Sequence, residues 1–378
     1  MSSHVLIIGA GPAGLAAAEA ASGRGARVTL CGTEPYPPYW RPRLTHFLSA
    51  PVEADKLLIR KPEWYVEHGI ELKTGMTAES VCLERKVAQW ADGSKTTWDG
   101  LVLATGSTAS VPAVVGAEHA MTLRTYDDAV QLRKSALASG QVTIVGGGLL
   151  GLEAAWELNA AGVSTTLIER NQWLMPRQLN RTGGEFLKRK LEQAGLTIVI
   201  GRDPSSMGEL YADRCVILCA GVQANLSAIA GTGIQTGRAI VVDDQMKTSA
   251  DGVYACGDVA EYNGRSWGLL PVAQEQGKVA GANAAGGDAV YVETPPSPML
   301  KIGAVGVFSV GSVAEGEGIL SLSEQTEDSY ACVMLRDGVI SGAVLAGNTA
   351  MGMKLKKAVG EKRVFSGIQN LSDVFKML

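Results

Sequence analysis

The chain has 378 residues, 34 of them basic and 38 acidic, which gives a formal net charge of −4. This length suits two or three domains, the charge excludes a global basic field for nucleic acid, and no apolar run is long enough to cross a membrane. Six scattered cysteines without a CxxC pair, and an N-terminus without a secretory signal, predict a reduced cytoplasmic protein, in which we expect no metal site.

A glycine-rich motif comes directly after the first predicted strand, residues 4–8. It consists of Gly9, Gly11, Pro12, Ala13 and Gly14, and an alanine-rich helix follows it. Between a strand and a helix, GxGxxG binds a dinucleotide, because the glycines permit a tight turn and the helix N-terminus offers unpaired N–H groups to the pyrophosphate. An acid after the second strand, 27–31, should bind the ribose. Glu34 is the candidate, and an exposed loop carboxylate is the alternative.

A second motif of the same kind follows the strand predicted at 141–145. It consists of Gly146, Gly147, Gly148, Leu149, Leu150 and Gly151. Glu169 ends the next strand, about 20 residues after the first glycine, and favours NAD(H) because a carboxylate repels a 2′-phosphate. Arg170 beside it leaves NADP(H) open, since arginine can hold a phosphate. Two such motifs predict two dinucleotides bound together, a fixed flavin and a diffusible nicotinamide.

Three further segments, at 101–106, 216–221 and 248–258, are similar to segments that one superfamily of flavoproteins carries beside its two glycine-rich motifs. With them the chain resembles the pyridine nucleotide–disulfide oxidoreductase superfamily. The resemblance implies an α/β fold with two Rossmann-like dinucleotide-binding domains of the glutathione-reductase type and a small α+β C-terminal domain. It implies a discontinuous FAD-binding domain at 1–113 and 236–294, an NAD(H)-binding domain at 114–235 and the C-terminal domain at 295–378.

The resemblance also implies cofactor contacts. Asp258 should meet the ribityl chain of FAD, and Arg41 should reach the FAD pyrophosphate by bidentate donation, a plain loop arginine being the alternative. Further positions at the two cofactors are Arg43, Ala78, Ala104, Thr105, Gly106, Gly221, Gly257, Leu270, Pro271 and Val272.

The absence of redox cysteines narrows the subfamily. Thiol-dependent members carry one or two near residues 41–44 or a CxxC in the NAD domain, whereas this chain has Pro38-Tyr-Trp-Arg-Pro-Arg-Leu44. That segment is similar to the YxRPxL of rubredoxin and ferredoxin reductases, and the whole chain is most similar to the rubredoxin reductases. The resemblance implies electron flow from NADH through FAD to rubredoxin, a small acidic iron protein. An NADH oxidase, a reductase of ferredoxin, flavorubredoxin or a nitrite reductase-like system, and a flavin-dependent redox sensor stay open, as does the oligomeric state, a monomer included.

Three side chains are candidates for the reaction centre. The resemblance places Glu153 beside the nicotinamide and the flavin edge, and Lys301 over the flavin face or its N1–C2 edge. Ferredoxin reductases carry a lysine where His46 stands, so we expect His46 or Arg43 to take its role beside Glu153. Solvated surface side chains are the alternative for each.

A basic segment closes the chain. Residues 351–378 hold six basic side chains against two acidic ones, and a helix predicted from about Ala350 carries Lys354, Lys356 and Lys357. Because charge steers the encounter between proteins, we expect this helix to contribute to docking of the acidic partner, with a solvated helix face as the alternative.

Overall fold

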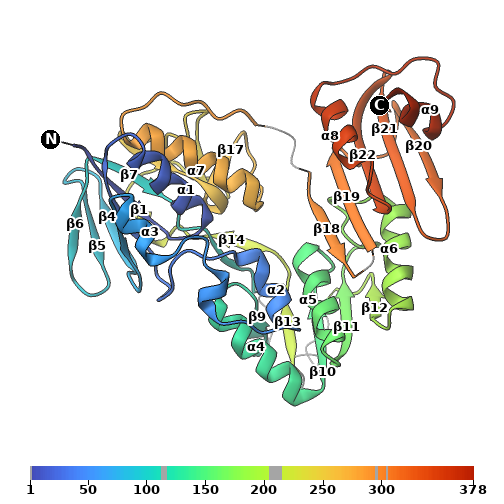
Figure 1. Cartoon of the computed structure of the whole chain (residues 1–378), viewed down its shortest axis with the longest axis horizontal. Coiled ribbons are helices and arrows are strands. Elements are labelled where there is room, and N and C mark those ends of the chain that lie inside the picture. The colour runs from blue at the N-terminus through green and yellow to red at the C-terminus, as the bar shows by residue number, and fades with distance from the viewer. Residues whose placement is uncertain (1, 112–116, 204–214, 294–296, 304) are drawn as a thin grey trace.

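The structure is a computed structural model that describes residues 2–111, 117–203, 215–293, 297–303 and 305–378. Three five-stranded sheets lie across the molecule, one at the left, one at the bottom and one at the right of Figure 1. The first two are parallel and carry helices, and the third is antiparallel. The predicted α/β fold with two Rossmann-like units and a smaller C-terminal unit is confirmed.

The first sheet has the order β16-β7-β1-β2-β3. Its strands are β1 (His4–Ile8), β2 (Arg27–Cys31), β3 (Ile70–Lys73), β7 (Gly100–Leu103) and β16 (Val253–Ala255). They form because they are nearly continuous apolar runs, which suits a parallel sheet that is covered on both faces. Beside it are α1 (Pro12–Ser22), α3 (Pro62–Glu67), α7 (Leu270–Ala284), an antiparallel ribbon of β4 (Ala78–Cys82), β5 (Val87–Trp90) and β6 (Lys95–Thr97), and the parallel pair β15 (Ile240–Val242) and β17 (Ala260–Tyr262).

The second sheet repeats this arrangement in the order β12-β11-β10-β13-β9. Its strands are β9 (Met121–Thr122), β10 (Gln141–Val145), β11 (Ser164–Glu169), β12 (Thr197–Ile200) and β13 (Val216–Leu218). Its helices are α4 (Tyr126–Ser139), α5 (Leu149–Ala160) and α6 (Arg181–Gln193). The chain joins the two sheets through β8 (Ser107–Ala109) and β14 (Val222–Ala224), which pair antiparallel.

The third sheet packs on the second. Its strands are β18 (Met299–Ile302), β19 (Val305–Gly311), β20 (Ile319–Gln325), β21 (Tyr330–Arg336) and β22 (Val339–Gly347), in the order β18-β19-β22-β21-β20. The helices α8 (Gly352–Gly360) and α9 (Leu371–Met377) pack on one face. From the second unit Asn180 donates to the Tyr330 hydroxyl at 2.7 Å and to Glu315 at 2.6 Å, so polar contacts join the two units.

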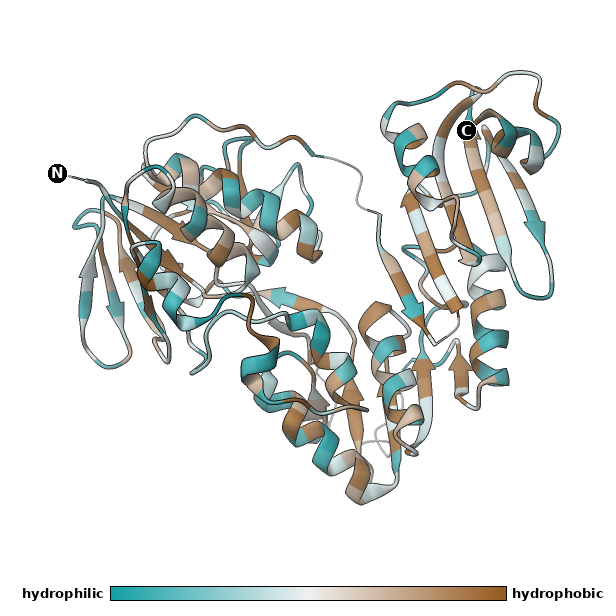
Figure 2. Ribbon diagram, viewed as in Figure 1, coloured by the Kyte–Doolittle hydropathy of each residue, from teal (hydrophilic) through white to brown (hydrophobic). Residues whose placement is uncertain are grey.

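Apolar residues line the interior of all three units, where the strands are brown in Figure 2. One hydrophobic cluster contains residues of both the second and the third sheet, including Leu167 and Val344. Within the described part of the chain, no helix is both long and apolar enough to span a membrane.

Two glycines let α1 and α7 approach until their backbones touch. A Cβ on Gly277 would lie 2.3 Å from the carbonyl oxygen of Ala13, and one on Gly281 would lie 2.0 Å from that of Ala17. Because backbone atoms cannot move aside as a flexible side chain can, this helix pair requires glycine at both positions. The contact fixes α1, whose first turn carries the first glycine-rich motif.

We therefore expect Gly281→Ala to lower the free energy of unfolding by about 1–3 kcal/mol through overpacking. The matched control is Gly360→Ala at the end of α8, where an added Cβ would meet nothing within 4 Å and the effect should be small. Chemical denaturation of both variants measures the difference. Equal stabilities would contradict the packing argument.

Candidate functional site

The two glycine-rich motifs adopt the same backbone conformation. Gly11 caps α1 with φ −86° and ψ −176°, and Gly148 caps α5 with φ −86° and ψ −173°. Neither cap supplies a side chain to the first turn, and a Cβ on either glycine would meet nothing within 4 Å. Each helix therefore offers unpaired N–H groups to the open space in front of its first turn, which suits a pyrophosphate. We call these two spaces the α1 cradle and the α5 cradle.

The glycines that flank each cap allow close backbone packing within the protein. A Cβ on Gly14 would lie 1.8 Å from the carbonyl oxygen of Gly9, and one on Gly151 would lie 1.9 Å from that of Gly146. Gly9 and Gly146 have φ of +118° and +115°, a region that L side chains rarely adopt. The glycine at each of these positions allows a turn and a close approach, as the sequence predicted.

The remaining predicted positions of the first site lie around the carboxyl end of the first sheet. Ala104, Thr105 and Gly106 follow β7, and Asn225 donates its backbone N–H to Gly106 and its amide to Thr105 at 2.9 and 3.0 Å. Gly257 has φ +77° and donates its N–H to the buried Gln276 at 3.0 Å. Leu270, Pro271 and Val272 open α7, and Ala78 opens β4.

Arg124 joins this site from outside the first sheet. It donates through Nη2 to Asp258 at 2.7 Å and through Nε to the carbonyl oxygen of Ser107 at 3.0 Å, while the Ser107 hydroxyl also donates to Asp258 at 2.7 Å. Sequence reasoning identified Asp258 and missed Arg124. It follows β9, more than 100 residues from its partner, and no local motif marks it.

Glu34 and Arg41 form a pair at 2.7 Å. The Tyr39 hydroxyl donates to the other carboxylate oxygen of Glu34 at 2.5 Å, and Arg41 also donates to the carbonyl oxygen of Arg124. The structure thus brings the predicted ribose ligand and the predicted pyrophosphate ligand together. The Glu34 carboxylate keeps acceptor positions beyond these two donors, because an ionised carboxylate can accept about four hydrogen bonds.

Glu169 is buried beneath the second motif. It accepts the N–H of Gly147 at 2.6 Å and two donors of Asn171 at 2.7 and 2.6 Å. A Cβ on Gly147 would lie 2.8 Å from the Leu174 side chain and 3.0 Å from the Glu169 carboxylate, so a larger residue there would displace these side chains. Oε2 accepts only the Gly147 N–H among the described residues and keeps a position for a ribose hydroxyl.

The other positions predicted at the second site surround this loop. Leu149 and Leu150 form the first turn of α5, Arg170 is exposed after β11, and Gly221 lies between β13 and β14 with φ +108°.

The reaction-centre candidates meet where α2 (Leu44–Phe47) packs against α5. Glu153 accepts from the Thr45 hydroxyl at 3.2 Å, whereas His46 bonds to Glu157 through Nδ1 at 2.7 Å. The structure therefore brings His46 near Glu153 without the expected direct bond, and Thr45 occupies that role. Arg43 is exposed, and its guanidinium has no hydrogen bond or ion pair with the described residues. Lys301 is exposed on β18 beside α5.

Burial raises the pKa of the Glu153 carboxyl, and the nearby Glu157 acts in the same direction. The Thr45 hydrogen bond and His46 oppose this shift. Glu153 is thus a half-buried acid close to the N-terminus of the helix that carries the second cradle.

The cysteines around the cradles are poor thiolates. Burial raises the pKa of Cys31, Cys219 and Cys256 to about 12. Because the thiolate is the reactive form, these side chains act as packing residues. Six cysteines are free, as the sequence predicted.

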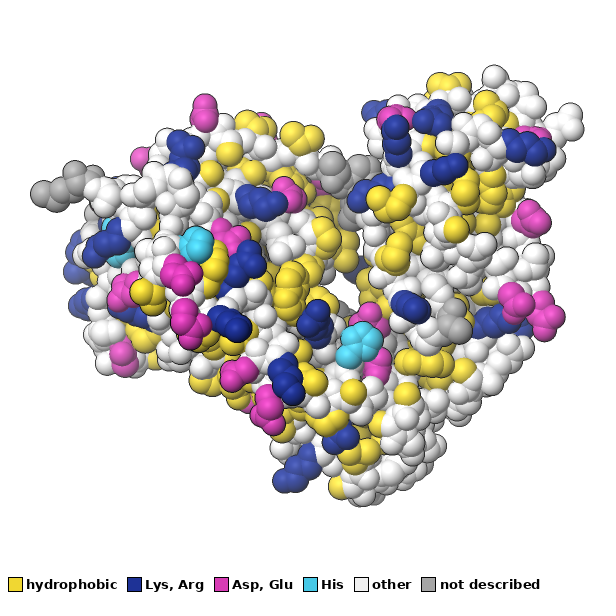
Figure 3. Space-filling view, in the orientation of Figure 1, with side chains coloured by type: hydrophobic (Ala, Val, Ile, Leu, Met, Phe, Trp, Pro, Cys, Tyr) yellow, Lys and Arg dark blue, Asp and Glu magenta, His cyan; other side chains and the backbone are white. Residues whose placement is uncertain are grey.

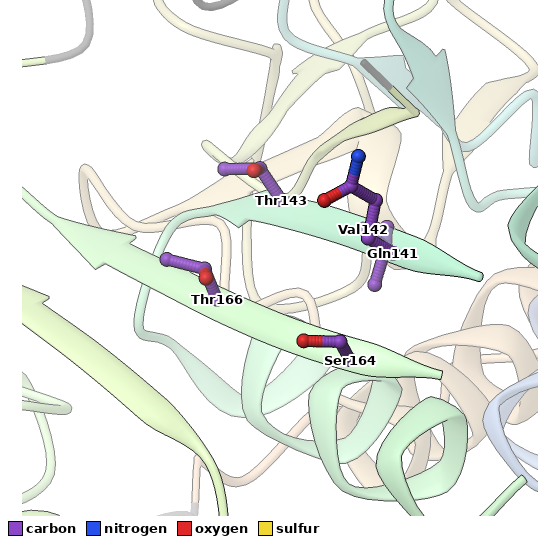
Figure 4. A pocket seen from close by; sticks show the side chains of 5 residues that line it. All are labelled: Gln141, Val142, Thr143, Ser164 and Thr166. Carbon is purple, nitrogen blue, oxygen red and sulfur yellow. The ribbon is translucent and has the colours of Figure 1, made fainter. Parts of the chain in front are cut away.

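One small cavity lies at the other end of the second sheet. It measures about 40 Å³ and is lined by Gln141, Val142, Thr143, Ser164 and Thr166 (Figure 4). Gln141 and Ser164 begin β10 and β11, whereas the glycine motif follows the end of β10, so this cavity is separate from the cradle. Among the described residues, no group of His, Cys, Asp and Glu is arranged to hold a metal ion.

Comparison with known proteins matches the whole chain. Residues 3–277 match the pyridine nucleotide-disulphide oxidoreductase family, and residues 296–363 match the rubredoxin NAD+ reductase C-terminal domain. The NADH-rubredoxin oxidoreductase of Clostridium acetobutylicum is 37% identical over 100% of both chains, and its crystal structure superposes with a TM-score of 0.91. The ferredoxin–NAD(+) reductase subunit of a Pseudomonas putida benzene 1,2-dioxygenase system is 32% identical over 69% of this chain and 68% of its own.

The half-buried Glu153 makes stability depend on pH. Its raised pKa means that the folded chain holds this proton more tightly than the unfolded chain, so stability is lost as the pH rises above the ordinary value of 4.5 toward the raised value. Glu153→Gln cannot ionise and should unfold at a higher temperature than the wild type at neutral pH. Thermal unfolding across a pH series should show that gain shrinking as the pH falls toward 4.5, and a gain that grows on acidification would contradict it.

Arg124→Ala should weaken FAD retention roughly tenfold, because it leaves the Asp258 carboxylate without its cation in a half-buried setting. Flavin fluorescence on dilution of the holoprotein measures the release. Arg60→Ala is the control, since it breaks a more exposed pair with Glu19 at 3.1 Å. Equal FAD retention in the two variants would contradict the role of Arg124 in supporting Asp258 at the FAD site.

Proposed function

This chain belongs to the pyridine nucleotide-disulphide oxidoreductase family, and on that premise we propose that it passes electrons from NADH through FAD to rubredoxin. The observation that carries the acceptor is the match of residues 296–363 to the rubredoxin NAD+ reductase C-terminal domain, joined to 37% identity with a rubredoxin-reducing relative along the full chain. The two open cradles at Gly11 and Gly148 support the two dinucleotides.

The α1 cradle would hold FAD, which would supply the capacity to take up a hydride from NADH and to release electrons singly to an acceptor. The chain's own residues bind and orient. We assign the FAD pyrophosphate to the α1 cradle with Arg41, and the ribityl chain to Asp258, which Arg124 and Ser107 hold in place. We assign NADH to the α5 cradle with Glu169 at its ribose and Glu153 beside its nicotinamide.

The setting of the thiols supports direct transfer to an external acceptor. Desolvation raises the pKa values of Cys219 and Cys256 near the cradles, so electrons have no reactive thiol pair to enter there. The free cysteines also support a cytoplasmic location.

The three sheets support the division of the chain into domains. We propose an FAD-binding domain of 1–113 and 236–294, an NAD(H)-binding domain of 114–235 and a C-terminal domain of 295–378. The strands of the first sheet come from both parts of the proposed FAD-binding domain, because β16 pairs with β7.

A basic surface supports docking of an acidic partner on the C-terminal domain. Figure 3 shows lysine and arginine side chains gathered at the top of the right-hand lobe, over α8 and α9. Lys354 and Lys357 are exposed on α8, and Lys356 is half-buried. Met353 beside them is 67% exposed, which gives the surface an apolar contact within a basic rim.

Stopped-flow spectroscopy tests the acceptor. NADH should bleach the flavin, and fast reoxidation should require added rubredoxin. Fast reoxidation by air alone would show an oxidase instead, and a persistent reduced complex that alters protein binding would show a sensor.

Reversing the charge of Lys354, Lys356 and Lys357 to Glu should slow reoxidation by rubredoxin roughly tenfold or more at low ionic strength, because steering is lost. The difference should fade in high salt, where exposed charges are screened. The control reverses the exposed Lys56, Lys95 and Lys134, which lie in the other units. An equal effect in both triple variants would place docking elsewhere.

A further inference from the structure

One stripe of α5 joins the second unit to both other units. Glu153, Trp156 and Glu157 are three and four residues apart and so share a helical face. The two acids contact α2, which follows the predicted FAD ligand Arg41, while Trp156 packs on the turn after β18. A Cβ on Gly303 in that turn would lie 2.1 Å from the Trp156 ring, so glycine is required there.

The contact between α2 and α5 contains two separate polar links. Thr45 donates to Glu153, and one turn further His46 and Ser49 both bond to Glu157. The His46 side chain is 71% exposed, whereas that of Glu157 is 13% exposed. The acid that His46 engages is therefore Glu157, not the acid expected beside the nicotinamide.

We propose that His46, Ser49 and Glu157 are positioning residues that fix the NADH-binding helix against the segment carrying Arg41. This inference rests on the proposed function, since it concerns the approach of NADH to the flavin. The α5 cradle and Glu157 lie on one rigid helix, so a shift of Glu157 shifts whatever the cradle holds. On the other side, Arg41 is tied to Glu34 at 2.7 Å, which fixes the FAD-side segment.

The His46 side of its ion pair with Glu157 is open to solvent, so the pair contributes little to stability. Hydride transfer, in contrast, depends steeply on the distance and angle between two bound rings. The link should thus influence the rate of flavin reduction while leaving the fold intact, which separates positioning from a structural role.

A double-mutant cycle tests the link with His46→Ala, Glu157→Ala and the combined variant of the holoenzyme. Each should lower the limiting rate of flavin reduction by NADH roughly two- to tenfold with a smaller change in the NADH dissociation constant. The combined variant should be no slower than the slower single variant, because both remove the same link. His46→Asn, which keeps a donor near the position of Nδ1, should recover much of the rate.

Hydrogen exchange gives a readout without turnover. Amides of α2 and of the first turns of α5 should exchange faster in His46→Ala than in the wild type. The controls are His68→Ala and Glu185→Ala, which alter an exposed histidine and an exposed acid elsewhere. Unchanged reduction rates, losses that multiply in the combined variant, or unchanged exchange would each overturn the proposal. Because these measurements omit rubredoxin, they fail independently of the acceptor assignment.

Should Glu157→Ala not fold, the cycle is built instead from His46→Ala, Ser49→Ala and the variant that combines these two. They remove both donors to Glu157 and leave the buried acid in place. Rates that stay at the wild-type level in both would equally overturn the proposal.

Discussion

Unpaired backbone N–H groups at two helix starts are the feature on which the rest of the molecule depends. A helix end without a capping side chain leaves donors that must find a partner or water. At Gly11 and Gly148 the chain omits the serine, threonine or aspartate that commonly caps a helix, and it also omits the Cβ that would fill the space. The unpaired N–H groups at each helix start therefore favour an anionic ligand. The surrounding glycines let the strand, turn and helix pack closely and so keep the space for that ligand open.

The two cradles belong to different units, so the units must be held in a fixed relative position for the two cofactors to meet. Long-range polar contacts between the units serve this purpose. Arg124 of the second unit donates to Asp258 of the first, and the Tyr39 hydroxyl of the first unit accepts the backbone N–H of Tyr126 at the start of α4. The stripe on α5 adds the contacts with α2 and with the turn after β18. The same helix therefore serves as ligand cradle and as the common neighbour of all three units.

The local signals in the sequence predicted both cradles, most of the strands and the free cysteines, because strand–glycine–helix motifs and apolar runs act over a few residues. The partners of Asp258 and Glu153 could not be predicted in this way. Arg124 is 134 residues from Asp258, and Thr45 is 108 residues from Glu153, so only the tertiary fold brings them together. The short edge strand β18 was also missed, since four residues after a proline-rich segment carry no clear periodicity. His46 lies near Glu153 but bonds to Glu157, one helical turn further along α5, a difference that residue spacing does not resolve.

The ribbon of β8 and β14 has a consequence for how such a chain can change. The polypeptide leaves the first unit at Ser107 and returns at Ala224, and these two residues are opposite one another in the ribbon. Asn225 then fastens the returning strand to Thr105 and Gly106. Because the two ends of the intervening segment are paired neighbours, its length can change between them while the path of the chain through the first unit stays the same.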